Sequence, residues 1–153
     1  MRKLIKFLHT IGAIGMMGAM ACLLVLLAWL PADAAGSADA AAMRQAMGAI
    51  ASWVFLPSLA LTLVAGLLAM AANRGYQNAG WAWIKLATGV LVFEAGFSGV
   101  VGPMQDAAAR STEVVGTAED AGAATGTIWV LLAIAALNVA LGVWRPRVMR
   151  RRE

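Results

Sequence analysis

Three ionisable side chains lie within long apolar stretches of this chain: His9, Lys85 and Glu94. In a hydrocarbon environment such groups are costly, so they usually face a protein interior and mark a functional site. An imidazole can ligate a metal ion or haem iron, and an ammonium group can bind an acidic group of a ligand. A carboxyl group at membrane depth can hydrogen-bond between helices. These three residues are therefore the first candidates for chemistry.

The segments that carry these residues are typical of a membrane protein. Hydrophobic residues make up 61% of the chain and charged residues 13%, with a mean hydropathy of +0.77. A soluble domain has about 45–50% apolar and roughly a quarter charged residues. A helix of about 20 residues crosses the hydrocarbon layer and satisfies its own backbone hydrogen bonds there. We predict an all-α, four-helix transmembrane bundle that forms a single domain of residues 1–153, with spans at about 4–30, 46–72, 81–102 and 127–144.

The basic residues are divided unevenly between the two sides of such a bundle. Nine of the twelve Lys and Arg residues lie at the N-terminus, in the 73–80 turn or in the C-terminal segment, whereas Arg44 and Arg110 lie in the other two connections. Basic loops stay in the cytoplasm, so we expect both termini there, in a bacterial-type cytoplasmic (inner) membrane. Tryptophans prefer the membrane interface, and five lie near the predicted span ends: Trp29, Trp81, Trp83, Trp129 and Trp144. The expected partner is a lipid bilayer and not nucleic acid.

Depth along the helices groups some of the polar residues. At 1.5 Å per residue, His9, Lys85 and Asn138 fall within one layer of the cytoplasmic leaflet. Glu94 lies roughly 13 Å deeper than Lys85, level with Thr62 on the second span. Glu94 also points about 180° away from Lys85 around their helix. Because a charge in lipid is costly, we nevertheless expect Glu94 to face the bundle interior.

Three segments resemble helices of the CopD/HemJ-like membrane proteins and their uncharacterised relatives. They are residues 4–13 around His9, the second span with Arg44 before it and Pro57, Thr62 and Gly66 within it, and Trp83-Ile84-Lys85-Leu86 at the start of the third. The HemJ branch consists of haem-associated protoporphyrinogen oxidases with a functional histidine in helix 1 and a lysine in helix 3. The resemblance implies those roles for His9 and Lys85. The CopD branch is linked to copper uptake or resistance.

The first functional hypothesis is a protein that binds b-type haem or another tetrapyrrole in the cytoplasmic-leaflet half of the bundle. Histidine is a common axial ligand of haem iron, and we place His9, Lys85 and Asn138 at this site. The role would be redox chemistry or a step linked to haem biosynthesis. The first span ends in Trp29, Leu30 and Pro31, and it lacks the aromatic and basic residues that are expected after the first helix of HemJ. Enzymatic activity therefore stays open; if present, it would be that of a HemJ-like oxidoreductase.

Two alternatives stay open beside haem. Thioether sulfur suits Cu(I), so a copper-handling protein could use an outer site lined by Met20, Met43, Met47 and Met104. Methionine also fills irregular gaps in apolar cores. The third hypothesis is a non-enzymatic structural membrane subunit whose polar groups only hold the helices together. A homo-oligomer or a complex with other membrane proteins is compatible with all three.

Overall fold

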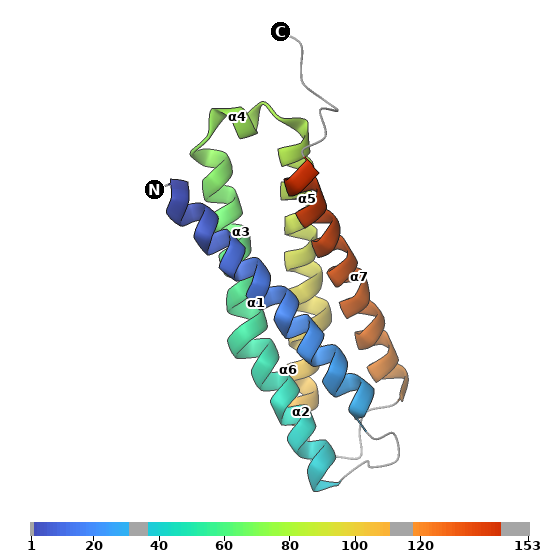
Figure 1. The fold of residues 1–153 in the computed structure, drawn as a ribbon. Helices are drawn as coiled ribbons and strands as arrows, with labels where there is room; N and C mark the ends of the chain where they lie inside the picture. The colour runs from blue at the N-terminus through green and yellow to red at the C-terminus, as the bar shows by residue number, and fades with distance from the viewer. Residues whose placement is uncertain (1, 31–36, 111–117, 145–153) are drawn as a thin grey trace.

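The computed structural model describes residues 2–30, 37–110 and 118–144, and the side chains of the last segment from Ala121 onwards. Within these residues, four long helical segments pack as a bundle, and each is long and apolar enough to cross a membrane (Figure 1). Their elements in chain order are α1 (Arg2–Trp29); α2 (Ala38–Ile50), η1 (Ala51–Phe55) and α3 (Leu56–Ala71); α5 (Gly80–Gly96), η2 (Phe97–Val101) and α6 (Gly102–Ala109); and α7 (Ala118–Trp144). A short helix, α4 (Arg74–Gln77), joins α3 to α5.

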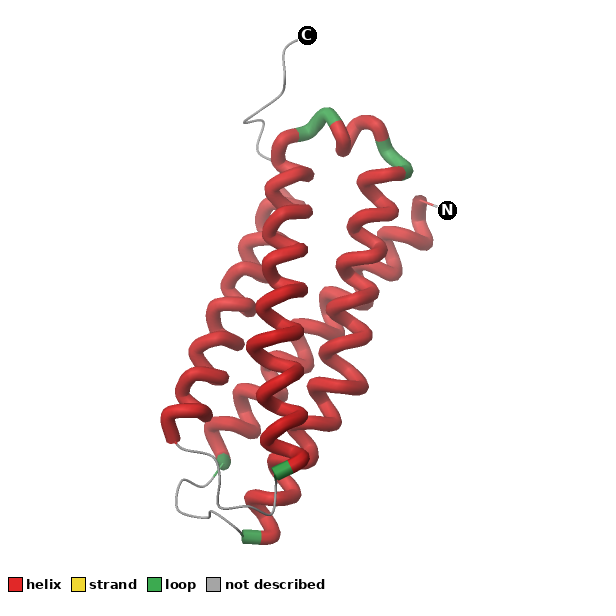
Figure 2. The backbone as a smooth tube through the Cα atoms, turned by 180° about the vertical axis from the view of Figure 1, so that it is seen from behind, coloured by secondary structure: helices red, strands yellow, loops and turns green. Residues whose placement is uncertain are grey.

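The bundle has two distinct ends. The start of α1, the short helix α4 and the end of α7 lie together at what we call the α4 end (Figure 1). The end of α1 and the start of α2 lie at the opposite end, which we call the far end. Helix α1 packs against α3, and α5 packs against α7; contacts of α3 with α5 and of α1 with α7 complete the bundle. The view from behind shows the described chain as helices joined by short connections (Figure 2).

The second and third long segments each contain a π-helical turn shortly before a proline. The Leu56 amide donates to the Ala51 carbonyl, and the Gly102 amide donates to the Phe97 carbonyl, both five residues back. Pro57 and Pro103 follow one residue later. Proline has no amide proton and its ring crowds the preceding turn, so the helix widens there instead of breaking.

These two segments are longer than the spans predicted from hydropathy. The second begins at Ala38 instead of residue 46, because the Ser37 side chain accepts a hydrogen bond from the Ala40 amide at 3.2 Å and caps the helix. The third continues through α6 to Ala109 instead of ending near residue 102. A 34-residue helix such as Ala38–Ala71 is about 51 Å long, which exceeds the hydrocarbon layer of about 30 Å. Helices α2 and α6, which pack on each other, therefore extend the bundle at the far end.

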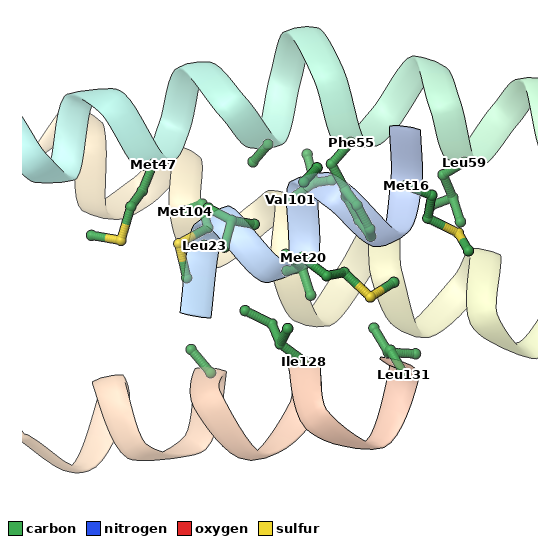
Figure 3. Close-up of a cluster of buried hydrophobic side chains, with 14 of the residues drawn as sticks. Met16, Met20, Leu23, Met47, Phe55, Leu59, Val101, Met104, Ile128 and Leu131 are labelled. Carbon is green, nitrogen blue, oxygen red and sulfur yellow. The ribbon is translucent and has the colours of Figure 1, made fainter. Parts of the chain in front are cut away.

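The large buried side chains gather in the half of the bundle nearest the far end. Figure 3 shows this core, in which Phe55 from η1 and Met20 from α1 lie among side chains from all four segments. Its largest fully buried members are Phe55, Met20, Leu23, Met47, Ile128, Leu131, Val100 and Val101.

The outward surface of the bundle is strongly apolar. In the most apolar 18-residue stretch of each span, at most 28% is buried inside the bundle. The remaining apolar residues face outwards, where they contact lipid. The protein is a multi-pass integral membrane protein with four spans. Trp129 lies eleven residues after the start of α7 at Ala118, and its place at the membrane interface stays a prediction.

Candidate functional site

A cavity of about 420 Å³ lies between the long helices in the half nearest the α4 end. Ligand pockets in proteins typically measure about 300–1,000 Å³. Much of its wall consists of small residues, among them Ala13, Gly66, Gly89 and Ala135. A methyl group added at Gly89 would meet no atom within 4 Å, so the space beside this glycine is open. The α4 half of the bundle is hollow where the far half is packed.

His9 is held at this cavity by a backbone hydrogen bond. Its Nδ1 lies 2.9 Å from the carbonyl oxygen of Thr62 on α3. A carbonyl oxygen only accepts, so Nδ1 carries a proton in this contact, and in the matching neutral tautomer the lone pair is on Nε2. Histidines that bind metals are usually oriented in this way, with the second ring nitrogen donating to a carbonyl or carboxylate. His9 is therefore held as a ligand that can bind through Nε2.

The close approach of α1 to α3 makes this hydrogen bond possible. A methyl group added at Gly12 would lie 2.5 Å from Thr62 Oγ1 and 2.9 Å from the Ser58 carbonyl oxygen. Only glycine allows the two backbones to come so near. The Thr62 hydroxyl donates to the Ser58 carbonyl at 2.7 Å, and the Thr62 carbonyl accepts from His9 Nδ1 at 2.9 Å.

The opposite wall of the cavity is polar where α5 meets α7. The Thr88 hydroxyl donates to Asn138 Oδ1 at 2.9 Å and links the two helices. One turn nearer the α4 end, Lys85 Nζ lies against α7, so that a methyl group added at Gly142 would be 2.8 Å from it. Lys85, Thr88 and Asn138 are all half-buried. The α5–α7 contact thus positions an ammonium group and an amide at the cavity wall.

The charge of the cavity wall is positive. Lys6 and Lys85 both line it, and no acidic residue belongs to its lining among the described residues. Tyr76 and Trp81 add a hydroxyl and an indole N–H, and their rings pack edge to face with centroids 5.7 Å apart. An apolar cavity with two ammonium groups fits a ligand that has a large apolar body and acidic substituents.

The structure brings His9, Lys85, Asn138 and Thr62 to one cavity, whereas Glu94 lies elsewhere. The Glu94 side chain is exposed on the outer face of α5, so the expectation that it faces the interior is wrong. Lys85 and three residues at helical spacing from it line the cavity or pack in the core, and the periodicity of α5 turns Glu94 away from them. Those three residues are Gly89, Val92 and Gly96.

The methionines proposed for copper lie mainly in the apolar core. Met20, Met47 and Met104 are buried there, where Figure 3 shows their thioethers among aliphatic and aromatic side chains. Met43, one turn from Met47 on α2, is half-buried. Their packing is that of core residues, and copper binding stays a prediction.

Two residues of the cavity lining, Tyr76 and Trp81, were not assigned to the site from the sequence. Lys6, which the haem hypothesis expects near the acidic groups of the ligand, does line the cavity; it precedes His9 by three positions and shares its helical face. Tyr76 and Trp81 lie in and just after the polar connection between α3 and α5, where periodicity gives no direction. The C-terminal arginines from residue 145 onwards lie outside the described residues.

No protein-family model matches this chain, and no curated protein or solved structure matches it either. The resemblance to CopD/HemJ-like proteins therefore stays a prediction from the three segments quoted above. Four membrane-length helices packed as a bundle are what the structure itself provides.

Proposed function

We propose that this membrane protein binds a tetrapyrrole, of the b-type haem class, in the cavity at the α4 end. The orientation of His9 carries the proposal. Its Nδ1 donates to the Thr62 carbonyl, so the lone pair of Nε2 is available to an iron atom at the cavity wall.

The other cavity residues match the remaining parts of such a ligand. Gly89 leaves room for a flat ring next to the α5 backbone. Lys6 and Lys85 provide ammonium groups that can pair with two carboxylates. The Asn138 amide, held by Thr88, adds a hydrogen-bonding group on the α7 side. Each part of the wall thus has a counterpart in an apolar ring with acidic side chains.

We assign to this site a redox or haem-biosynthesis role. Bound haem would supply one-electron chemistry, whose potential depends on the axial ligand and the burial of the iron. The chain's own residues would hold the ring and pair with its carboxylates, and the packed core would exclude water from the side of the cavity nearest the far end. A HemJ-like oxidoreductase is the enzymatic form of this proposal.

The orientation in the membrane follows from charge. Arg2, Lys3, Lys6 and Arg74 all lie at the α4 end, near the start of α1 and the short helix α4. The positive-inside rule then directs the α4 end, and with it the cavity, to the cytoplasm of a bacterial-type inner membrane.

An absorption spectrum of the detergent-purified protein, expressed with ample haem, tests the proposal. We expect a Soret band in the wild type, its loss or shift in His9→Ala, and no change in Lys3→Ala, which removes a charge outside the cavity lining. Thermal unfolding shows whether the His9→Ala protein is folded. A colourless wild type would contradict haem binding. Metal analysis of the same sample tests the copper alternative, which expects Cu(I) that Met43→Ala and Met47→Ala reduce.

A further inference from the structure

A stripe of exposed side chains runs along the outer face of the third long segment. Successive members are three, four, three and four residues apart, which is the spacing of a helix–helix seam. All five are exposed in the bundle: Ile84, Ala87, Leu91, Glu94 and Ser98. We call them the α5 stripe.

Glu94 is out of place on a surface that faces lipid. It lies fourteen residues after Gly80, about 21 Å along the helix and within the hydrocarbon layer. Its side chain has no hydrogen bond or ion pair with any other residue in the described part of the chain. An isolated carboxyl group in hydrocarbon is costly, so this face requires a partner that satisfies it.

The other exposed charged residues among those described lie near the helix ends. They are Arg2, Lys3, Lys6, Asp39, Arg74, Asp106 and Arg110. No other described face of the bundle therefore presents a charged group at the depth of Glu94. This distinguishes the α5 stripe from the purely apolar lipid-facing surfaces.

We propose that the α5 stripe packs against the same stripe of a second copy of this chain, with the two Glu94 carboxyl groups hydrogen-bonded to each other. Two copies with one orientation in a bilayer are related by a two-fold axis along the membrane normal, which brings residues of equal depth together. A protonated carboxyl group has one donor and acceptor capacity, so a pair of them is self-complementary. Ala87 and Ser98 are small and allow the helices to approach closely on either side of Glu94.

Cysteine cross-linking in native membranes tests the position of the interface. In a Cys22→Ala background, Leu91→Cys should form disulfide-linked dimers on oxidation. Leu137→Cys on α7 is the matched control, because Leu137 is 64% exposed and Leu91 is 63% exposed. We expect cross-linking at Leu91 and not at Leu137. Equal cross-linking at both positions, or none at Leu91, would overturn the proposal.

Substitutions of Glu94 test the hydrogen bond itself. Glutamine keeps a donor and an acceptor, so Glu94→Gln should dimerise like the wild type. Leucine has neither, so Glu94→Leu should weaken dimerisation by between about threefold and twentyfold, measured by energy transfer between labelled copies in lipid vesicles. Unchanged dimerisation of Glu94→Leu, or cross-linking of Leu91→Cys to a different polypeptide only, would refute the second copy as partner. Haem content is a separate readout, because Glu94 lies outside the cavity lining.

Discussion

The two halves of the bundle use the same four long segments and differ in what fills the space between them. In the far half, Phe55, Met20 and Leu23 are fully buried and meet side chains from the other segments. In the α4 half, several of the buried residues are small, such as Gly12, Ala65 and Ala82, and a cavity takes up the remaining volume. The difference shows that packing four helices together does not by itself give a core without cavities. The size of the side chains between the helices decides whether the space is filled.

Polar contacts between helices occur in both halves. In the far half, Arg44 is buried and Gln105 Nε2 donates to Ser52 Oγ at 3.0 Å. The hydrogen bonds of His9 with Thr62 and of Thr88 with Asn138 both join different helices in the hollow half. Because a buried polar group needs a partner, polar residues are tolerated best where they can bind each other or a ligand. The far half is closely packed, and the α4 half contains the cavity and the candidate site.

The largest expected effect comes from removing a large side chain from the core of the far half. Phe55→Ala removes a fully buried ring and should lower the free energy of unfolding by about 3–5 kcal/mol. The control is Trp53→Ala, two residues away in η1, where the ring is 82% exposed and a change within about 0.5 kcal/mol is expected. Denaturant unfolding in detergent measures both, and equal losses would show that the far half is not a dry core.

The next largest effect is expected at the close contact between α1 and α3, which lies in the hollow half. Gly12→Ala places a methyl group against the Ser58 and Thr62 backbones and should destabilise the protein by about 1–3 kcal/mol. Gly18→Ala on the same helix meets nothing within 4 Å and should have almost no effect. If both substitutions shift the unfolding midpoint equally, the α1–α3 contact is looser than described.

Two glycines on α5 compare the halves directly. A methyl group at Gly96 would lie 3.0 Å from the Phe55 ring, so Gly96→Leu should cost about 1–3 kcal/mol through overpacking. Gly89→Leu projects into open space and should leave stability within about 1 kcal/mol while it removes haem from the cavity. Thermal unfolding and the absorption spectrum give the two readouts. A reversed order of stabilities would remove the distinction between the halves.

The smallest expected effect is at the edge of the cavity. Gly142→Ala adds a methyl group 2.8 Å from Lys85 Nζ and should displace the ammonium group with little change in stability. We expect a severalfold faster loss of haem to an acceptor protein, and a still faster loss in Lys85→Ala, which removes the ammonium group altogether. Haem loss at the wild-type rate in both variants would exclude Lys85 from binding.

The sequence predicted the four apolar helices, because hydropathy and length are properties of each segment alone. It did not predict the extensions at the far end. Helices α2 and α6 are less apolar, and their ends depend on the Ser37 cap and on the π-helical turns before Pro57 and Pro103. Such local hydrogen bonds do not change the hydropathy of a segment, so the hydropathy pattern does not predict where these helices end.

For the site, depth arithmetic grouped His9, Lys85 and Asn138, and the structure lines one cavity with all three. Their binding role stays a prediction. Glu94 shows the limit of a general rule. The cost of a charge in lipid predicted that Glu94 faces inwards, whereas its position about 180° from Lys85 around the helix agrees with the exposed position that it has. The position of a side chain around a helix is set by the backbone, whereas the cost of a charge in lipid can be relieved by a contact with another molecule, which the pattern of one chain does not reveal.

The packed far half also determines how material could move through this molecule. Fully buried residues such as Phe55, Met20 and Ile128 seal the cavity from the far end. In this conformation the cavity is closed towards the far end and does not form a channel between the two ends of the bundle. A ligand that enters the cavity from the α4 end would therefore have to leave by the same end.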